Sequence, residues 1–255
     1  MTADTTADRA GSRQLQGRKI VITGAASGIG AATAELFAAH GAQLALLDQQ
    51  EDALREIASR VGAVHHAMDV SDEASVANAV ANAARDLGGI DGVVNCAGIY
   101  IKTPLLETTM EDWQKTLAVN LTGTFLICRA AAPFLFGAPA STIVNLSSAI
   151  GLTPFVDRGA YAASKGGVIA FSKVLSMELA PRIRVNVVAP GSIDTPMVQT
   201  AYGGATGVAA NSDRYALKRI GRADEVAQSI LFLTSEASSL ITGVTLAVDG
   251  GRTFH

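Results

Sequence analysis

The stretch Thr23–Gly30, TGAASGIG, joins an apolar run to a helical run and decides how this chain folds. The run before it, Lys19–Gly24 (KIVITG), is typical of a buried strand, and Gly30–His40 is typical of a helix that Gly41 ends. Glycines let such a turn fold tightly and approach a phosphate, while the first turn of the helix offers free N–H groups and the positive end of its dipole. The stretch therefore predicts a loop that holds a pyrophosphate.

The same alternation of short apolar runs and helical stretches continues along the chain. The apolar runs are nearly continuous in Val, Ile, Leu and Ala, which is typical of strands covered by helices on both faces. Strands separated by helices pair in parallel through right-handed crossovers. We therefore expect an α/β chain with a Rossmann-like doubly wound parallel β-sheet flanked by helices. It forms a single domain over residues 17–255, preceded by a polar tail at 1–16.

The expected strands are 19–24, 42–48, 63–69, 92–98, 141–148, 183–191 and 243–251. The expected helices are 30–40, 51–61, 74–87, 109–136 with a kink near Gly123, 161–179 and 223–233.

Composition excludes several classes of function. The 255 residues carry a net charge of -3 with no block of like charges, so nucleic acid is not an expected partner. No apolar run approaches the ~18 residues that span a bilayer, and the N-terminus lacks a secretory core, so we expect a cytoplasmic protein without a membrane partner. Cys96 and Cys128 lie in apolar surroundings and are expected as reduced thiols, and no spacing suggests a metal site.

An acidic residue follows the glycine stretch at the expected distance. Asp48 ends the second expected strand, where about 20 residues after the glycines a carboxylate can accept from both ribose hydroxyls. It would repel a 2′-phosphate, and the following residues DQQED include no Arg or Lys, so NAD is favoured over NADP. The alternative is that Asp48 caps a helix or a turn. Asp69 ends the third expected strand. Its carboxylate either faces the adenine amino group of the dinucleotide or opens a local turn before the next helix.

Four motifs occur in one order: TGAASGIG, NCAG (Asn95–Gly98), YAASK (Tyr161–Lys165) and PGSIDTPM (Pro190–Met197). Together they resemble the short-chain dehydrogenase/reductase family over about Gly17–His255. The first fits the family pattern TGxxxGxG, and the second fits NNAG with Cys96 in place of an Asn. The resemblance implies a cofactor site of Gly24, Ser27, Gly28, Ile29, Gly30, Asp48, Asp69, Val70, Asn95, Ala97, Gly98, Tyr161, Lys165, Pro190, Gly191, Ile193 and Thr195.

The resemblance also implies four catalytic residues, Asn120, Ser148, Tyr161 and Lys165. Ser148 is chosen because it stands thirteen residues before Tyr161, and Ser147 takes its place if the register shifts by one. A free tyrosine has a pKa near ~10, and a nearby cation lowers that value. Lys165 lies one helical turn beyond Tyr161 and would lower it, and Asn120 would hold a water that connects Lys165 to solvent.

Candidate substrate residues are mainly apolar: Ser148, Ile150, Phe155, Tyr161 and Met197, with Ile99, Tyr100, Ala149 and Tyr202 nearby. With Arg158 as the one neighbouring cation, they favour an uncharged or partly apolar secondary alcohol or ketone, such as a polyol, a cyclic alcohol or a 3-hydroxyacyl compound. Residues 198–218 are rich in Gly and Ala and are expected to form a substrate lid, with an unstructured loop as the alternative.

The resulting hypothesis is an NAD(H)-dependent oxidoreductase that interconverts a secondary alcohol and a ketone. Tyr161 is its general base in oxidation and its general acid in reduction. The resemblance implies a homotetramer. Two alternatives are an epimerase or dehydratase of the same fold and a non-catalytic NAD-sensing module, although a sensor needs no proton donor.

Overall fold

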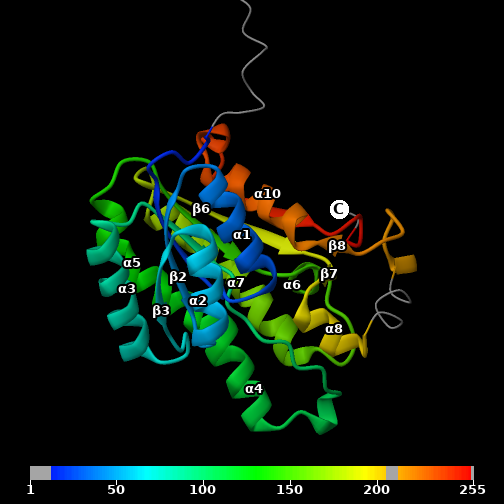
Figure 1. Cartoon of the computed structure of the whole chain (residues 1–255). Coiled ribbons are helices and arrows are strands. Elements are labelled where there is room, and N and C mark those ends of the chain that lie inside the picture. The colour runs from blue at the N-terminus through cyan, green and yellow to red at the C-terminus, as the bar shows by residue number, and fades with distance from the viewer. Residues whose placement is uncertain (1–12, 205–211, 254–255) are drawn as a thin grey trace, which may run out of the picture.

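The computed structural model describes residues 13–204 and 212–253, and it has the expected parallel sheet between two layers of helices (Figure 1). The sheet strands are β1 (Lys19–Thr23), β2 (Gln43–Asp48), β3 (Val64–Ala67), β4 (Gly92–Asn95), β5 (Ser141–Leu146), β6 (Ile183–Pro190) and β9 (Thr245–Val248). Two short strands, β7 (Ile193–Asp194) and β8 (Gly221–Arg222), pair with each other apart from it.

The helices are α1 (Gly28–Ala39), α2 (Glu51–Val61), α3 (Glu73–Leu87), α4 (Met110–Leu117), α5 (Gly123–Phe136), α6 (Ala149–Leu152), α7 (Gly159–Glu178), α8 (Pro196–Tyr202) and α10 (Ala223–Thr234). Short helical turns are η1 (Leu105–Glu107), η2 (Ala118–Thr122), η3 (Ser212–Arg214) and η4 (Glu236–Ser238).

The strand order β3-β2-β1-β4-β5-β6-β9 confirms the predicted doubly wound topology, because every neighbouring pair is parallel. From β1 the chain builds outward to β3 on one side, and from β4 it builds outward to β9 on the other. The crossovers thus diverge between β1 and β4, which leaves a crevice at the carboxyl ends of these two strands. The loops that follow β1 and β4 meet at this crevice.

Alternating residues of the strands pack into two separate hydrophobic cores, one on each face of the sheet. Ile20 and Ile22 of β1 point into the core shared with α1, α2 and α10, whereas Val21 points into the core shared with α3, α5 and α7. This period of two explains why the strands are apolar throughout. Figure 1 shows α1, α2 and α10 on one side of the sheet and α3 and α5 on the other.

Part of the expected tail belongs to the domain. Leu15 is fully buried in the α1 core, and its N–H donates to the carbonyl oxygen of His40. Residues 1–12 of that tail, residues 205–211 of the expected lid and residues 254–255 lie outside the described residues.

The kink expected near Gly123 is a π-helical turn at Ala118–Thr122, between α4 and α5. This turn ends one residue before Gly123. Asn120 lies within the turn, and the Asn120 side chain is fully buried in the interior. Such turns often mark functional positions. The preceding helix α4 begins at Met110, one residue later than expected, and Thr109 is its N-cap, whose side chain accepts from the N–H of Asp112.

Met110–Phe136 is one stretch, within the described residues, that is long and apolar enough to cross a membrane. The core helices of globular proteins pass the same test of length and composition. Leu126, Ile127 and Leu135 of its second half are buried in the core shared with α3, so we assign the stretch to the packed fold.

Candidate active site

The glycine loop between β1 and α1 is shaped by its own packing. A Cβ on Gly24 would lie 2.7 Å from the backbone nitrogen of Ala97, and a Cβ on Gly30 would overlap the carbonyl oxygen of Gly24. Gly24 and Gly28 also have positive φ values of 65° and 55°. Gly24 and Gly30 therefore let the loop close onto the turn after β4 and onto α1, while Gly28 lies close to Thr195, where a Cβ would stand 3.2 Å from the Thr195 side chain.

A groove of about 1390 Å³ runs along the carboxyl ends of the central strands. Most of the predicted cofactor residues line it: Gly24, Ser27, Gly28, Ile29, Gly30, Asp48, Asp69, Val70, Ala97, Gly98 and Thr195. An adjoining hollow is lined by the predicted residues Ser148, Tyr161, Lys165, Pro190, Gly191 and Ile193. The structure thus places the glycine loop and the YxxxK residues on one continuous surface, because Ile29, Gly98 and Thr195 line both parts.

Asp48 lies at the rim of the groove and is 9% exposed. One carboxylate oxygen accepts from the N–H of Ala26 at 3.0 Å, and the other accepts from the N–H of Gln50 at 3.0 Å. The carboxylate therefore ties the glycine loop to the end of β2, and the helix cap of α2 is Gln50 rather than Asp48. Acceptor capacity remains on both oxygens, since a carboxylate has about four lone-pair sites.

Asp69 makes the local turn that was the alternative to an adenine contact. Its Oδ1 accepts from the N–H of Ser71 at 2.8 Å and from the hydroxyl of Ser71 at 2.6 Å. These two hydrogen bonds lower the pKa of the Asp69 carboxyl. Asp69 also lines the groove, so the turn and the groove use the same side chain.

Asn95 is not placed among the residues that line the groove or the adjoining hollow. It is buried on β4, and its amide donates to Asn145 Oδ1 on β5 at 2.8 Å. Asn145 in turn donates to Ser172 of α7 at 2.9 Å. Side chains alternate between the two faces of β4, and Asn95 points into the packed interior rather than into the groove. Through Asn145, it links β4 to β5 and α7.

The hydroxyls of Ser147 and Ser148, the two candidates for the catalytic serine, have different partners. Ser147 also lines the hollow, but its hydroxyl donates to the backbone oxygen of Lys165 at 2.8 Å. Ser148 caps α6 by accepting from the N–H of Ile150, and it lines the hollow together with Tyr161. Of the two, only Ser148 lines both the hollow and the second pocket beside Tyr161.

Asn120 makes three side-chain hydrogen bonds within the protein. Its Oδ1 accepts from the N–H of Ile99 at 2.8 Å, and its Nδ2 donates to the carbonyl oxygen of Ile99 at 3.0 Å and to Ser164 Oγ at 3.1 Å. The side chain thus clamps the turn after β4 to α7, close to Lys165. Both Nδ2 hydrogens are used, so a water held by Asn120, as the resemblance implies, would have to donate to the second lone pair of Oδ1 or to the backbone.

Burial dominates the protonation of the central pair. It raises the pKa of Tyr161 to about 12, although a hydrogen bond from Ser148 acts in the opposite direction. It lowers the pKa of Lys165 to about 8. The Lys165 ammonium lies 5.9 Å from the centre of the Tyr161 ring and donates to the carbonyl oxygen of Leu146 at 2.9 Å. The lowered Tyr161 pKa expected from the sequence is therefore not produced by the chain alone.

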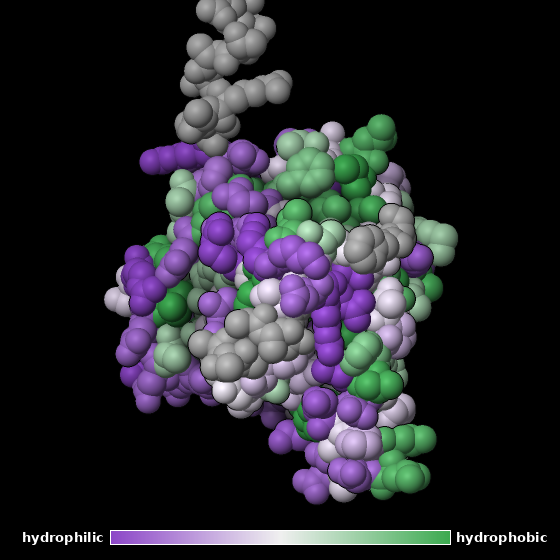
Figure 2. Space-filling model, turned by 90° about the vertical axis from the view of Figure 1, so that its right-hand side faces the viewer, coloured by the Kyte–Doolittle hydropathy of each residue, from purple (hydrophilic) through white to green (hydrophobic). Residues whose placement is uncertain are grey.

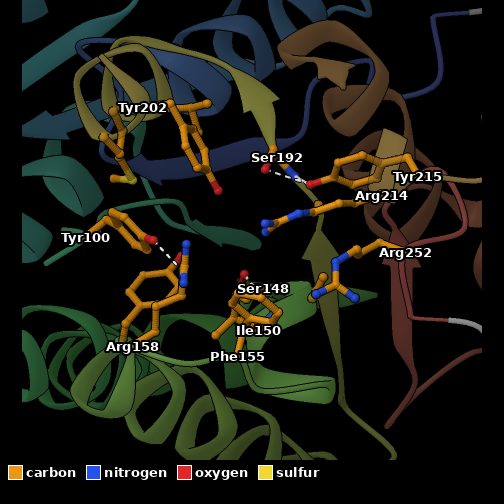
Figure 3. Close-up of a pocket in the computed structure, with 16 residues that line it drawn as sticks. Tyr100, Ser148, Ile150, Phe155, Arg158, Ser192, Tyr202, Arg214, Tyr215 and Arg252 are labelled. Atoms are coloured by element: carbon orange, nitrogen blue, oxygen red, sulfur yellow. Dashed lines mark hydrogen bonds between the residues drawn. The ribbon is translucent and has the colours of Figure 1, made fainter. Parts of the chain in front are cut away.

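A second pocket, of about 650 Å³, opens beside Ser148 and Tyr161 (Figure 3). All five residues predicted to contact the substrate line it: Ser148, Ile150, Phe155, Tyr161 and Met197. So do Tyr100, Ala149 and Tyr202, whereas Ile99 lines the groove instead. The pocket is less apolar than expected, because Arg214 and Arg252 join Arg158 in its wall.

A sequence pattern indicates a position near the pocket for only one of Arg214 and Arg252. Arg252 stands just beyond the end of β9, and residues after parallel strands gather at one edge of the sheet. Arg214 belongs to η3, which no local pattern connects to the pocket. The face that carries α8 and β8 shows hydrophilic side chains across its middle (Figure 2).

A doubly wound sheet, with a groove at its switch point and a Ser–Tyr–Lys set beside it, defines a dinucleotide-binding oxidoreductase. The family model described as Enoyl-(Acyl carrier protein) reductase matches residues 24–253. Trans-4-hydroxycyclohexanecarboxylate dehydrogenase of Sinomonas cyclohexanicum is 39% identical over 91% of this chain and 92% of its own. D-threitol dehydrogenase of Mycolicibacterium smegmatis is 38% identical over 94% of each chain.

Among solved structures, a short-chain dehydrogenase/reductase (glucose/ribitol dehydrogenase) from Brucella melitensis superposes with a TM-score of 0.91 at 38% identity. That match covers 96% of this chain and all of the other. The chain therefore belongs to the short-chain dehydrogenase/reductase family. Dehydrogenases of this family use nicotinamide cofactors, and the relatives named here support oxidoreduction of a CH–OH group.

Proposed function

We propose that this protein is an NAD(H)-dependent dehydrogenase that interconverts a secondary alcohol and a ketone, with Tyr161 as the general acid and base. The observation that carries the proposal is the meeting of Ser148 and Tyr161 in the walls of both the hollow beside the groove and the second pocket. One side of this pair faces the cofactor groove, and the other faces a separate space for a substrate.

The groove fits a nicotinamide dinucleotide. Gly28 leaves space where a Cβ would stand 3.2 Å from Thr195, and the N-terminal turn of α1 faces the same opening. Asp48 lines the groove and Lys165 lines the adjoining hollow, and we assign one ribose to each of them. Bound there, the cofactor supplies a two-electron hydride acceptor or donor.

NAD is favoured over NADP by the residues around Asp48. Its neighbours in the groove wall, Gln49 and Gln50, are uncharged, so nothing adjacent would pair with a 2′-phosphate. A carboxylate that is 9% exposed would repel that phosphate at short range. The same carboxylate can accept from the ribose hydroxyls of NAD.

The chain's own residues would move one proton. In ketone reduction, the Tyr161 phenol, protonated at neutral pH because burial raises its pKa to about 12, donates its proton to the substrate oxygen. In oxidation, Tyr161 must first be ionised, and nearby positive charge would stabilise its phenolate; the phenolate then accepts the alcohol proton and becomes a neutral phenol. Lys165 supplies part of this charge, and Ser148 orients the substrate oxygen.

The test is a panel of alcohols and ketones, assayed at 340 nm with NAD(H) and NADP(H). It should include D-threitol, cyclohexanol and 4-hydroxycyclohexanecarboxylate, because the relatives suggest polyols and cyclic alcohols. Tyr161→Phe and Ser148→Ala should lose about 100-fold or more of turnover while retaining NADH binding. Ser147→Ala is the matched control, because its hydroxyl bonds only to the Lys165 backbone, and it should keep most turnover.

Near wild-type turnover by Tyr161→Phe would show that the assignment is wrong. Product isomerisation without net NADH formation would instead support an epimerase. Binding of NAD with no turnover of any panel member would support a sensor module.

A cytoplasmic homotetramer is part of this proposal. Side chains at least one-third exposed on α5 and α7 include Phe125, Phe134, Val174 and Met177, and apolar helix faces of this kind are commonly covered by another subunit. Light scattering should give the mass of four chains, and a monomer would contradict it.

A further inference from the structure

Three arginine side chains converge in the pocket beside Tyr161. The guanidinium carbons of Arg158, Arg214 and Arg252 lie 5.2, 5.0 and 5.8 Å from the ring centre of Phe155. They come from three separate segments: the turn before α7, η3, and the turn after β9. Figure 3 shows Arg158 and Arg214 reaching toward the space between Ser148 and Tyr202.

Arg158 is a buried cation with a fixed orientation. It is 6% exposed, its Nε donates to the Tyr100 hydroxyl at 2.6 Å, and its Nη1 donates to the carbonyl oxygen of Val156 at 2.6 Å. Its Nη2 makes no hydrogen bond to a described residue. Burying a cation is costly unless an anion compensates it, so its position requires explanation.

No described acidic side chain forms an ion pair with any of the three arginines. Asp249 lies close in sequence to Arg252, but its carboxylate is occupied by backbone N–H groups and by the Thr253 hydroxyl. The like charges would repel one another around one aromatic ring, and an anion would relieve this.

The cluster stands close to the reacting position. The rings of Tyr100 and Tyr161 pack edge to face with their centres 4.9 Å apart, and Arg158 bonds directly to Tyr100. A ligand oxygen at Tyr161 and an anion at Arg158 are thus separated by about one side chain. Between them the wall is apolar, with Ile150, Phe155 and Met197.

We infer that the substrate of this protein is a secondary alcohol or ketone that carries an anionic group, a carboxylate or a phosphate ester, bound by Arg158, Arg214 and Arg252. This inference rests on the proposed function and narrows its substrate class. It replaces the uncharged substrate expected from the sequence. Guanidinium groups suit this task because their planar forks match carboxylate and phosphate oxygens.

The first experiment compares substrates that share a carbon skeleton. They are 4-hydroxycyclohexanecarboxylate, its primary amide, and 4-hydroxycyclohexyl phosphate. At least one anionic compound should have a kcat/KM roughly 10- to 100-fold above that of the amide. The preferred anion identifies which of the two groups the arginines bind. Equal kcat/KM for the amide and both anions would overturn the inference while leaving the proposed alcohol dehydrogenase intact.

The second experiment changes the arginines. Arg214→Gln and Arg252→Gln should each raise KM for the preferred anion about 10-fold, with little change in kcat and no change for the amide. Arg214→Lys should recover part of the loss, because it restores the charge. Arg60→Gln is the control, since Arg60 is exposed and pairs with Glu35 on α1. Equal losses for anion and amide would show a merely structural role and contradict the inference.

A binding measurement separates this inference from the chemistry. Cyclohexanecarboxylate and cyclohexyl phosphate have no alcohol to oxidise, yet calorimetry should detect the binding of one of them to the NADH-bound protein. Cyclohexanecarboxamide should bind more weakly, and Arg214→Gln should remove this preference. If the anions bind no better than the amide, the arginine cluster is not an anion site.

Discussion

Replacing Asp48 with alanine should change both the stability of the protein and its choice of cofactor. The carboxylate holds two backbone N–H groups at 3.0 Å, and the N–H of Ala26 is in a buried residue. Hydrogen bonds to charged groups contribute about 1.5–3 kcal/mol each, but Gln50 is exposed and its N–H can turn to water. We therefore expect a net loss of about 2 kcal/mol, which corresponds to roughly 4–8 °C in Tm.

The effect on cofactor choice has the opposite sign for the two dinucleotides. NAD loses an ionised acceptor for its ribose hydroxyls, whereas NADP loses a repulsive charge near its 2′-phosphate. The ratio of kcat/KM for NAD to that for NADP should fall roughly 10- to 100-fold. Steady-state kinetics with both cofactors measures this ratio, and scanning calorimetry measures Tm.

Asp69→Ala provides the matched control for this substitution. It removes one negative charge from the same groove, but Asp69 bonds to Ser71 and not to the glycine loop. Its ratio of NAD to NADP efficiency should remain within about 3-fold of wild type. An unchanged ratio in Asp48→Ala, or a wild-type preference for NADP, would refute the reasoning.

Two further predictions concern packing and pH. Gly30→Ala should lower the free energy of unfolding by about 2–3 kcal/mol and weaken NADH binding, because its Cβ would overlap the Gly24 carbonyl. Gly166→Ala is the control, because its Cβ meets nothing nearer than 3.8 Å. In urea denaturation, it should leave the stability unchanged or raise it. Burial lowers the folded pKa of Lys165 to about 8 from 10.5, so between these values the unfolded chain binds more protons and the Lys165 contribution to stability rises with pH. Relative to Lys165→Met, the wild type should gain about 1–2 kcal/mol in unfolding free energy from pH 7.5 to 9.5, and a pH-independent difference would contradict the lowered pKa.

The parts of the fold that could be predicted from the sequence are those that a local pattern of residues determines. The apolar strand and the glycines of Thr23–Gly30 predicted β1, the loop and α1, because strand burial and tight turns limit the allowed residues. Boundaries were less accurate: α1 begins at Gly28 and α7 begins at Gly159, each two residues earlier than expected. Helix starts depend on capping contacts that the hydrophobic pattern does not show.

What the sequence could not show depends on how distant segments meet. The Asn95 side chain points toward Asn145 instead of lining the groove, and this contact requires the pairing of β4 with β5. The protonation of Tyr161 depends on how deeply α7 packs, which outweighs the charge of Lys165 one turn away. Arg214 reaches the pocket only through the path of the chain after α8.

The distribution of the pocket residues along the chain has a consequence for how this protein can diverge. Tyr161 and Lys165 share one long helix, whereas the arginines that face them come from three short connecting segments. Arg158 is the N-cap residue of that helix, but substitutions in the two segments that carry Arg214 and Arg252 can alter what enters the pocket without changing the helix itself. A laboratory library confined to residues 212–218 and 250–253 should yield variants with new substrate preferences and unaltered proton transfer, and natural lineages have the same route open to them.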